Sequence, residues 1–142
     1  MQESLFRDRI CLICQADHAF AVLKRATWAQ ILKEPFVSLT RDFTTRLQAD
    51  LFAHSKKLVL QPAHEVSLIT TALGMVQWGH GVTAQPARTL PLIQPLGLVA
   101  RPLAAPVVHR HLSLFYKRGH ELSPAAASFL EFLGETFVSP GH

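Results

Sequence analysis

In the stretch Arg9-Ile10-Cys11-Leu12-Ile13-Cys14, the charged Arg9 is followed directly by five apolar residues. The polar pair Asp17-His18 bounds the run on its other side. A short apolar run of this length, rich in strand-forming residues, predicts a buried strand. This segment is therefore the starting point for assigning the rest of the chain.

Short strand and helix patterns alternate outward from this run. Strands are expected at residues 36–39, 58–60, 81–85, 98–101 and 107–116, and helices at residues 28–33, 42–55, 65–78 and 124–135. Strands that alternate with helices indicate an α/β fold with a largely parallel sheet. Residues 87–95 contain two prolines and no periodicity, so we expect a connection there.

Capping residues and apolar stripes define the expected helices. Thr27, Asp42 and Ser123 stand where N-caps are expected, and Gly79 stands where a helix C-terminus is expected. Each longer helix should bury one stripe of apolar side chains spaced three or four residues apart. These stripes are Phe43, Leu47 and Leu51; Val66, Ile69, Leu73 and Val76; and Phe129, Phe132 and Leu133.

The composition fits a globular protein without a disulfide framework. The chain has 142 residues, of which 49% are hydrophobic, and this excludes disorder as a description of the whole chain. Two cysteines are too few for a disulfide scaffold. The N-terminus lacks the basic and apolar regions of a signal peptide, and no apolar stretch is long enough to span a bilayer. We expect a cytoplasmic protein without membrane contact.

The net charge of +4 is concentrated in the middle of the chain. Residues 51–120 carry seven basic side chains and one acidic side chain. A positive region of this kind attracts anions or nucleic acid. Only Lys56-Lys57 and Lys117-Arg118 are adjacent, however, so we interpret most of this charge as solubilising and do not predict DNA binding from it.

The sequence contains few candidates for catalysis or metal binding. Cys11 and Cys14 have redox or zinc spacing, but side chains three apart on a strand point to opposite faces. His109 and His111 would share one face of a strand, which leaves open a metal-dependent α/β enzyme as an alternative. We found no recognisable catalytic motif, and the expectation is a protein that is not an enzyme and uses no metal or cofactor.

The turn at residues 38–45 has the composition of an anion site. It joins an expected strand end to an expected helix N-terminus, where backbone N–H groups are free. Hydroxyl groups from Thr40, Thr44 and Thr45 and the cation of Arg41 lie in the same turn. These groups favour a small anion or carboxylate, and the alternative is an exposed turn with an ordinary helix cap.

The ordered motifs of the chain resemble the effector-binding (substrate-binding) domain of LysR-type transcriptional regulators. The resemblance covers about residues 5–137 and depends on order and spacing, because each motif is degenerate. The motifs are Asp17-His18-Ala19-Phe20-Ala21, Trp28-Ala-Gln-Ile-Leu32, Pro35-Phe36-Val37, Val76-x-x-Gly79-x-Gly81-Val82 with Pro86, Gly97-Leu98-Val99-Ala-Arg-Pro-Leu103, Pro106, Arg110, and Leu122-Ser-Pro-Ala-Ala126 followed by Phe129-Leu-Glu-Phe-Leu133. The sequence departs from the usual family pattern at Ala19, Trp78 and His80.

The resemblance implies a two-lobed, periplasmic-binding-protein-like (type 2) α/β fold. On this basis lobe two is complete and lobe one is partial. Residues 1–34 form the end of lobe one and a crossover, residues 35–86 form lobe two, and residues 87–142 cross over and return to lobe one with the C-terminal helix. The helix-turn-helix domain through which such regulators contact DNA is not part of this sequence.

The resemblance also implies a sensor of a small inducer, expected to be a carboxylate, bound in the cleft between lobes. The residues implied in ligand binding are Ser38, Thr40, Arg41, Phe43, Thr44, Glu65, Ser67 and Thr83. The helix at residues 42–55 resembles one that pairs effector domains, which implies a homodimer or tetramer. The alternative is a stand-alone small-molecule-binding or dimerisation module without a role at DNA.

Overall fold

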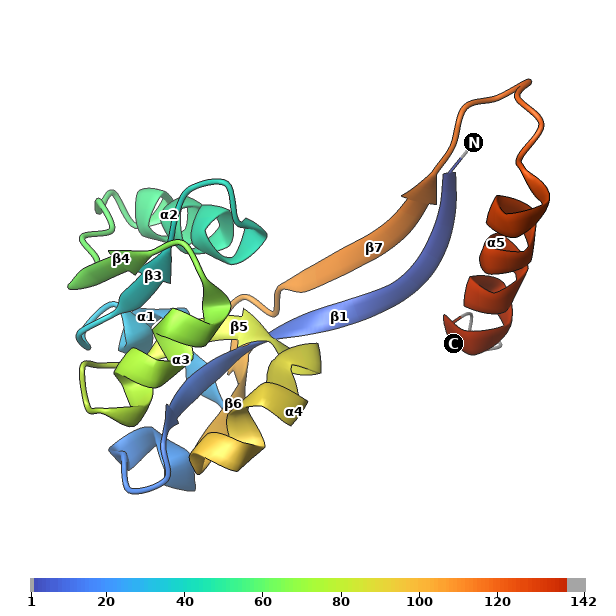
Figure 1. Ribbon diagram of the computed structural model, residues 1–142. Helices are drawn as coiled ribbons and strands as arrows, with labels where there is room; N and C mark the ends of the chain where they lie inside the picture. Colours follow the sequence, from blue (N-terminus) through green and yellow to red (C-terminus); the bar gives the residue numbers. More distant parts are fainter. Residues whose placement is uncertain (1, 138–142) are drawn as a thin grey trace. The chain divides into compact units, whose positions relative to one another are not determined.

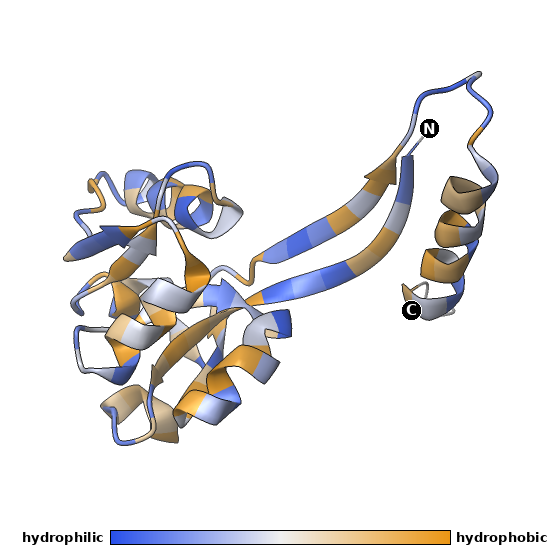
Figure 2. Cartoon of the chain, in the orientation of Figure 1, coloured by the Kyte–Doolittle hydropathy of each residue, from blue (hydrophilic) through white to orange (hydrophobic). Residues whose placement is uncertain are grey.

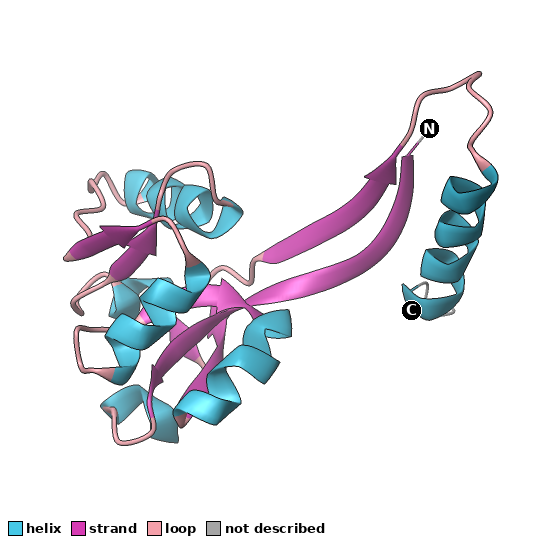
Figure 3. Cartoon of the chain, viewed as in Figure 1, coloured by secondary structure: helices cyan, strands magenta, loops and turns pink. Residues whose placement is uncertain are grey.

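The computed structural model describes residues 2–137, which form two compact units. Of these residues, 9–109 form the larger unit, and 2–8 and 110–137 form the smaller unit. Strand β1 (Gln2–Gln15) runs through both units. The larger unit contains β2 (Ala26–Thr27), α1 (Trp28–Ile31), β3 (Val37–Leu39), α2 (Thr44–Ser55), β4 (His64–Val66), α3 (Ile69–Gln77), β5 (Thr83–Pro86), α4 (Leu90–Ile93) and β6 (Leu98–Ala104), as Figures 1 and 3 show.

The apolar run in β1 is buried on both faces, as predicted. Alternate side chains of a strand point to opposite faces of its sheet. Ile10, Leu12 and Cys14 accordingly pack into one core cluster, whereas Cys11 and Ile13 pack into a second cluster on the other face. All five side chains are at most 7% exposed. The buried part of β1 therefore separates the two cores of the larger unit.

The sheet is mixed, so the prediction of a largely parallel sheet is wrong. β1 pairs antiparallel with both β5 and β6, while β2 pairs parallel with β6. β3 and β4 form a parallel pair. The alternation of strands and helices along the sequence does not fix the direction of each strand, and β5 and β6 both return along β1 in reverse.

Helices cover both faces of this sheet. On one face, Trp28 of α1 and Ala49 and Phe52 of α2 belong to the same cluster as Ile10 and Leu12. The opposite face has its own cluster, which holds side chains of α3, α4, β1 and β3, namely Leu73, Val76, Ile93, Ile13 and Val37. This arrangement of helix, sheet and helix is an α/β fold.

The N-cap of α1 is confirmed. Thr27 accepts a hydrogen bond from the backbone N–H of Gln30 at 3.3 Å, and the Gln30 side chain accepts one from the Thr27 N–H at 2.8 Å. This reciprocal capping box satisfies two backbone donors of the first turn. The helix ends before Pro35, where the residue preceding a proline disfavours helical geometry.

Helix α2 buries a different stripe from the predicted one. Thr45, Ala49 and Phe52 face the core, and Leu47 and Leu51 are 51% and 53% exposed. The two stripes lie about two residues apart around the helix, which is roughly 200°. The prediction followed the largest apolar side chains. The small side chain of Ala49 packs against the sheet instead, and Leu47 and Leu51 therefore remain on the surface.

Three further segments differ from the predictions. Residues 65–68 belong to β4 and to the connection after it, because Ser38 and Leu39 of β3 pair with Glu65 and Val66. Helix α3 therefore begins at Ile69. Residues 58–60 form no strand. The expected connection at residues 87–95 is largely helical, with α4 between the 3₁₀ turns Ala87–Thr89 and Gln94–Leu96.

The turn between α3 and β5 depends on glycine at two positions. Gly79 has φ +82° and follows the C-cap residue Trp78, as its predicted role at the helix C-terminus requires. Gly81 has φ +135°, and a Cβ atom at this position would lie 2.0 Å from the carbonyl oxygen of Pro35. The close approach allows Val82 N–H to donate to Pro35 O at 2.9 Å and Val37 N–H to donate to Val82 O at 2.8 Å. These two hydrogen bonds connect the start of β3 to Val82, the residue that precedes β5.

The smaller unit contains the N-terminal part of β1, most of β7 (His109–Phe115) and α5 (Pro124–Phe137). Ser123 caps α5 by accepting a hydrogen bond from Ala126 N–H at 3.3 Å, as predicted. The predicted buried face of α5 is wrong, because Phe129 and Phe132 are 60% and 57% exposed. Figure 2 shows the apolar colouring along this helix. Phe129, Leu130 and Leu133 of α5 line a pocket together with Leu114, Phe115 and Tyr116, so the apolar stripe is partly covered.

The division into lobes at 34/35 and 86/87 stays a prediction. Residues 9–34 and 87–109 pack in the same unit as residues 35–86. The physical reason is the pairing of β1 with β5 and β6. Among residues 2–137, no helix combines the length and apolar composition that crossing a membrane requires.

We expect Gly81→Ala to lower the free energy of unfolding by about 3 kcal/mol or more, because the added methyl group collides with backbone that cannot move independently. Gly97→Ala is the matched control. Gly97 also has positive φ (+68°), but a Cβ there has no neighbour within 4 Å. The control should cost only about 1 kcal/mol. Urea unfolding measures both values, and equal losses would show that the approach to Pro35 is not the constraint.

Candidate functional site

The carboxyl ends of β3 and β4 lie side by side and lead into the two longest helices of the larger unit. The strands are parallel, with Leu39 opposite Val66 at the end of the register. Thr40 N–H donates to Val66 O at 3.1 Å and extends the pairing by one step. The chain then enters α2 from β3 and α3 from β4. We name the segments 40–43 and 67–68, with the helix starts that follow them, the β3–β4 edge.

The helix N-termini at the β3–β4 edge have no side-chain caps. The N-cap residues are Phe43 for α2 and Leu68 for α3, and neither makes a side-chain capping bond. The predicted cap Asp42 is therefore wrong, because the helix starts one residue later than that role requires. The first backbone N–H groups of a helix lack intrahelical partners and carry partial positive charge. Two uncapped helix starts at one sheet edge can therefore donate to an anion.

A buried arginine connects the elements behind this edge. The side chain of Arg46 is only 3% exposed. Its Nη1 atom lies 2.5 Å from Glu65 Oε2 and donates to Ser38 Oγ at 3.2 Å. Its Nε atom donates to both carboxylate oxygens of Asp50, at 3.0 and 3.1 Å. One guanidinium thus joins α2, β3 and β4.

The charge of Arg46 is maintained by its partners. Burial alone lowers the pKa of Arg46, but the hydrogen bonds that Arg46 donates to Glu65 and Asp50, with the charges of these carboxylates, outweigh this and raise the pKa above its ordinary value. Glu65 is 46% exposed on its side chain. The Glu65 carboxylate already forms an ion pair with Arg46, so Glu65 stabilises the β3–β4 edge through this contact.

Two polar side chains follow one another on the same face of β5. Thr83 is 1% exposed and donates from Oγ1 to Val37 O at 2.7 Å. Gln85 is also 1% exposed and donates from Nε2 to Thr83 Oγ1 at 3.3 Å. The Oε1 atom of Gln85 is buried without a hydrogen-bond partner among the described residues. An acceptor of this kind can be satisfied by a ligand donor.

The structure brings together part of the predicted site. Thr40 and Ser67 stand at the β3–β4 edge, Ser38 lies buried one pair behind it, and Phe43 and Thr44 start α2. Ser67 precedes α3 and does not lie within it. Arg41 belongs to the segment 40–43 of this edge, and it also lines a groove of about 320 Å³ with residues of α2 and residues 58–60. The prediction for these eight residues as ligand contacts stays a prediction.

The sequence interpretation missed Arg46 and Gln85. Arg46 lies between Phe43 and Leu47 in the sequence, outside the predicted apolar stripe. Its spacing from Asp50 is the i, i+4 pattern of a helix ion pair, which was a local signal for one of its contacts. Glu65 lies nineteen positions away, and nothing local in the sequence links the two.

The cysteines and histidines of the described residues form no candidate metal site. Cys11 and Cys14 lie on opposite faces of β1, as predicted, and both are buried. Burial raises the pKa of the Cys14 thiol from 9.0 to about 11, against a smaller lowering effect of Arg101. Within residues 2–137, no group of three His, Cys, Asp or Glu side chains is placed to hold a metal ion. His109 and His111 lie on β7.

Sequence comparison gives one family over almost the whole chain. The model of the LysR substrate binding domain family matches residues 2–138. The chain is 27% identical over 129 residues to the Escherichia coli (strain K12) protein YbhD, an uncharacterized HTH-type transcriptional regulator. That alignment covers 91% of this chain and 41% of YbhD. The chain therefore spans less than half of this relative.

Structural comparison gives the same fold. The regulatory domain of CcmR from Synechocystis PCC6803, solved in complex with 2-PG, superposes with a TM-score of 0.82 at 16% identity, over 97% of this chain and 67% of that one. The effector-binding domain of QuiR in complex with shikimate gives a TM-score of 0.76 at 14% identity, with the same two coverages. The periplasmic-binding-protein-like (type 2) α/β fold is thereby confirmed.

We expect Arg46→Met to lower the free energy of unfolding by about 1–3 kcal/mol, because it leaves two carboxylates without their cation and keeps a similar side-chain volume. Arg41→Met removes the same charge from an exposed turn before the same helix and should change stability by less than about 0.5 kcal/mol. Urea unfolding at neutral pH measures both. If Arg46→Met lowers the free energy of unfolding as little as Arg41→Met does, Arg46 does not stabilise the packing of α2 on β3 and β4.

Proposed function

Because the chain belongs to the LysR substrate-binding domain family, we propose that it is the ligand-sensing portion of a LysR-type transcriptional regulator. Its ligand is a small molecule, and we propose a carboxylate. The observation that carries this proposal is the pair of uncapped helix starts, Phe43 of α2 and Leu68 of α3, at one sheet edge. The hydroxyl groups of Thr40 and Ser67 lie in the segments that lead into these helices.

The chemistry of this edge suits a carboxylate. Each carboxylate oxygen accepts hydrogen bonds, and the first-turn N–H groups and hydroxyls of the edge are donors. Thr83 and Gln85 form a buried polar pair on β5, and Gln85 Oε1 has no hydrogen-bond partner among the described residues. Two proteins of the same fold are solved with 2-PG and with shikimate, and shikimate is a hydroxylated carboxylate. These ligands support the proposal by analogy of fold only.

Contact with DNA belongs, in this proposal, to a part of the regulator outside these residues. The relative YbhD is an HTH-type regulator, and the chain aligns with 41% of it. The regulator acts in the cytoplasm, where its DNA target is accessible, and this segment senses rather than catalyses. The alternative, a stand-alone binding module, predicts the same ligand site but no partner domain.

We also propose that the segment self-associates through α2. Four large apolar side chains are exposed on α2 and on the segment after it: Leu47 (51%), Leu51 (53%), Leu58 (55%) and Val59 (81%). Contiguous apolar groups of this kind mark interaction surfaces. The proposed partner is a second copy of the chain, because α2 resembles the helix that pairs effector domains in this family.

Small carboxylates should raise the midpoint of thermal unfolding of the chain, because a ligand that binds only the folded state stabilises it. The panel contains shikimate, other mono- and dicarboxylates, and the neutral methyl ester of each acid. Thr40→Val with Ser67→Ala should weaken binding of the active acid about tenfold, since each variant removes a donor to a charged group.

The control variant is Ser128→Ala, which removes an exposed hydroxyl from α5, outside the proposed site. It should leave the affinity unchanged. Equal stabilisation by acids and methyl esters would contradict the carboxylate proposal. No loss of affinity in the Thr40 and Ser67 variant would contradict the position of the site.

Leu47→Glu with Val59→Glu should convert a self-associated chain to a monomer, because two like charges cannot be buried in an apolar contact without partners. Light scattering after size-exclusion chromatography measures the mass against 15.8 kDa for one chain. Phe129→Glu on α5 is the control for general removal of exposed apolar groups. A monomeric wild-type chain, or a monomer produced only by the α5 variant, would contradict self-association through α2.

A further inference from the structure

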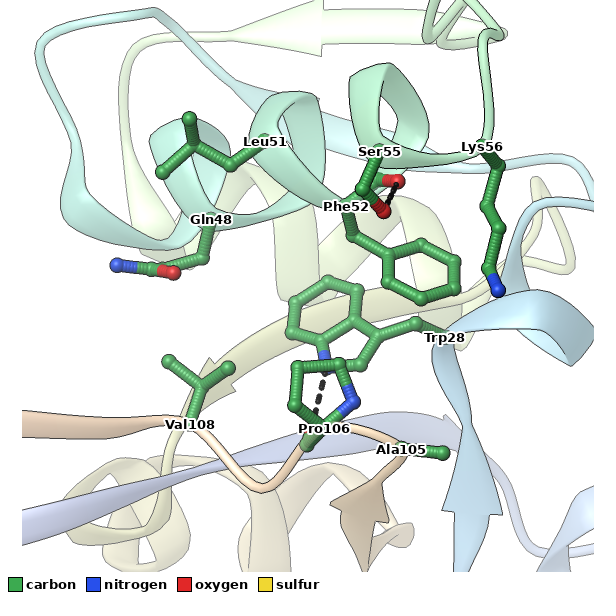
Figure 4. Close-up of a pocket in the computed structure, with 9 residues that line it drawn as sticks. All are labelled: Trp28, Gln48, Leu51, Phe52, Ser55, Lys56, Ala105, Pro106 and Val108. Atoms are coloured by element: carbon green, nitrogen blue, oxygen red, sulfur yellow. Dashed lines mark hydrogen bonds between the residues drawn. The ribbon is translucent and has the colours of Figure 1, made fainter.

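A groove beside the C-terminal half of α2 is separate from the β3–β4 edge. Its volume is about 380 Å³, which is within the usual range for small-molecule sites. It lies between α2 and the connection from β6 to β7, and Figure 4 shows its lining side chains. The lining residues are Trp28, Gln48, Leu51, Phe52, Ser55, Lys56, Ala105, Pro106 and Val108.

Two aromatic rings form the base of this groove. Trp28 is fully buried and Phe52 is 9% exposed, with their ring centroids 6.3 Å apart. The Trp28 indole Nε1–H donates to Pro106 O at 3.1 Å, so the base also holds the connection that forms the opposite wall. Leu51, Pro106 and Val108 complete the apolar lining. The walls are therefore fixed by packing and by one hydrogen bond.

A lysine lies at the rim of this apolar groove. The Nζ atom of Lys56 lies 5.8 Å from the centroid of the Phe52 ring. No acidic side chain lines the groove, and none of the ion pairs among residues 2–137 includes Lys56. Figure 4 shows the Gln48 amide on the other side of the two rings. The groove thus combines an apolar base, a cation and an amide.

The end of α2 fixes the position of Lys56. Lys57 has φ +57°, and its N–H donates to His54 O at 2.9 Å. Leu58 N–H donates to Ala53 O at 2.9 Å, which completes a Schellman cap. The positive charges of Lys56 and Lys57 together exceed the partial negative charge at the helix C-terminus, which is about half an elementary charge. The rim is therefore net positive.

We propose that this groove is a second small-molecule site that binds a small aromatic carboxylate. The ring lies against Phe52, Pro106 and Val108, and the carboxylate pairs with Lys56. An aliphatic acid leaves the flat base poorly covered, and a neutral aromatic leaves Lys56 unpaired. Phe43 at the β3–β4 edge is nine helical residues from Phe52, about 14 Å along α2, so one small ligand cannot occupy both places.

Trp28 provides a reporter inside the groove. In ¹H–¹⁵N spectra of the full chain, the indole N–H signal of Trp28 should shift saturably with benzoate, with a dissociation constant in the millimolar range expected for so small a ligand. The indole signal of Trp78, which is 81% exposed, serves as the internal control and should not shift saturably. Benzamide has the ring of benzoate without the charge, and acetate has the charge without the ring. Each should bind about fivefold more weakly than benzoate.

A matched pair of variants tests the role of the charge. Lys56→Gln should weaken benzoate binding about fivefold, whereas Lys57→Gln makes the same charge change one residue away and should weaken it less than about twofold. Both side chains are exposed, so both variants should fold, and the dispersion of the spectra verifies this.

Equal weakening by the two lysine variants would overturn a specific pairing with Lys56. Benzoate shifts confined to the amides of residues 40–46 and 67–71, with Trp28 unchanged, would place the ligand at the β3–β4 edge and would overturn the second site while supporting the first. The absence of any saturable shift of Trp28 would also overturn the proposal.

Discussion

The buried segment Ile10–Cys14 of β1 is the constraint on which the larger unit depends. Its side chains alternate between two cores, and its backbone pairs with β5 on one side and β6 on the other. A strand without a solvent-facing side must be covered by helices on both faces, because each exposed apolar face would cost hydrophobic free energy. The placement of α1 and α2 against one face, and of α3 and α4 against the other, follows from this requirement.

The β3–β4 edge follows from the same architecture. Helices on opposite faces must start from the carboxyl ends of neighbouring parallel strands, so the N-termini of α2 and α3 come to one place. Arg46 then links α2 to both strands through Glu65 and Ser38. Gly81 permits the close approach of Val82 to Pro35 that connects β5 to β3. The site is therefore a consequence of backbone direction, held in place by one buried cation and one glycine.

Local signals predicted the elements whose ends depend on nearby residues. The capping box of Thr27 and Gln30, the turn at Gly79 and the cap at Ser123 are all set within a few positions. Features that depend on distant partners were missed. Residues 65–68 leave the helical pattern because β4 pairs with β3, and the sequence does not show that Arg46 meets Glu65. The choice between two apolar stripes on α2 was likewise decided by space at the sheet.

The crystal structure of the chain with the carboxylate that stabilises it most would test the central claim directly. We predict that the carboxylate group will lie at the first turns of α2 and α3, within hydrogen-bonding distance of their free N–H groups, with Thr40 or Ser67 as a further donor. A carboxylate bound elsewhere, with no contact to either helix start, would contradict the assignment of the β3–β4 edge as the effector site.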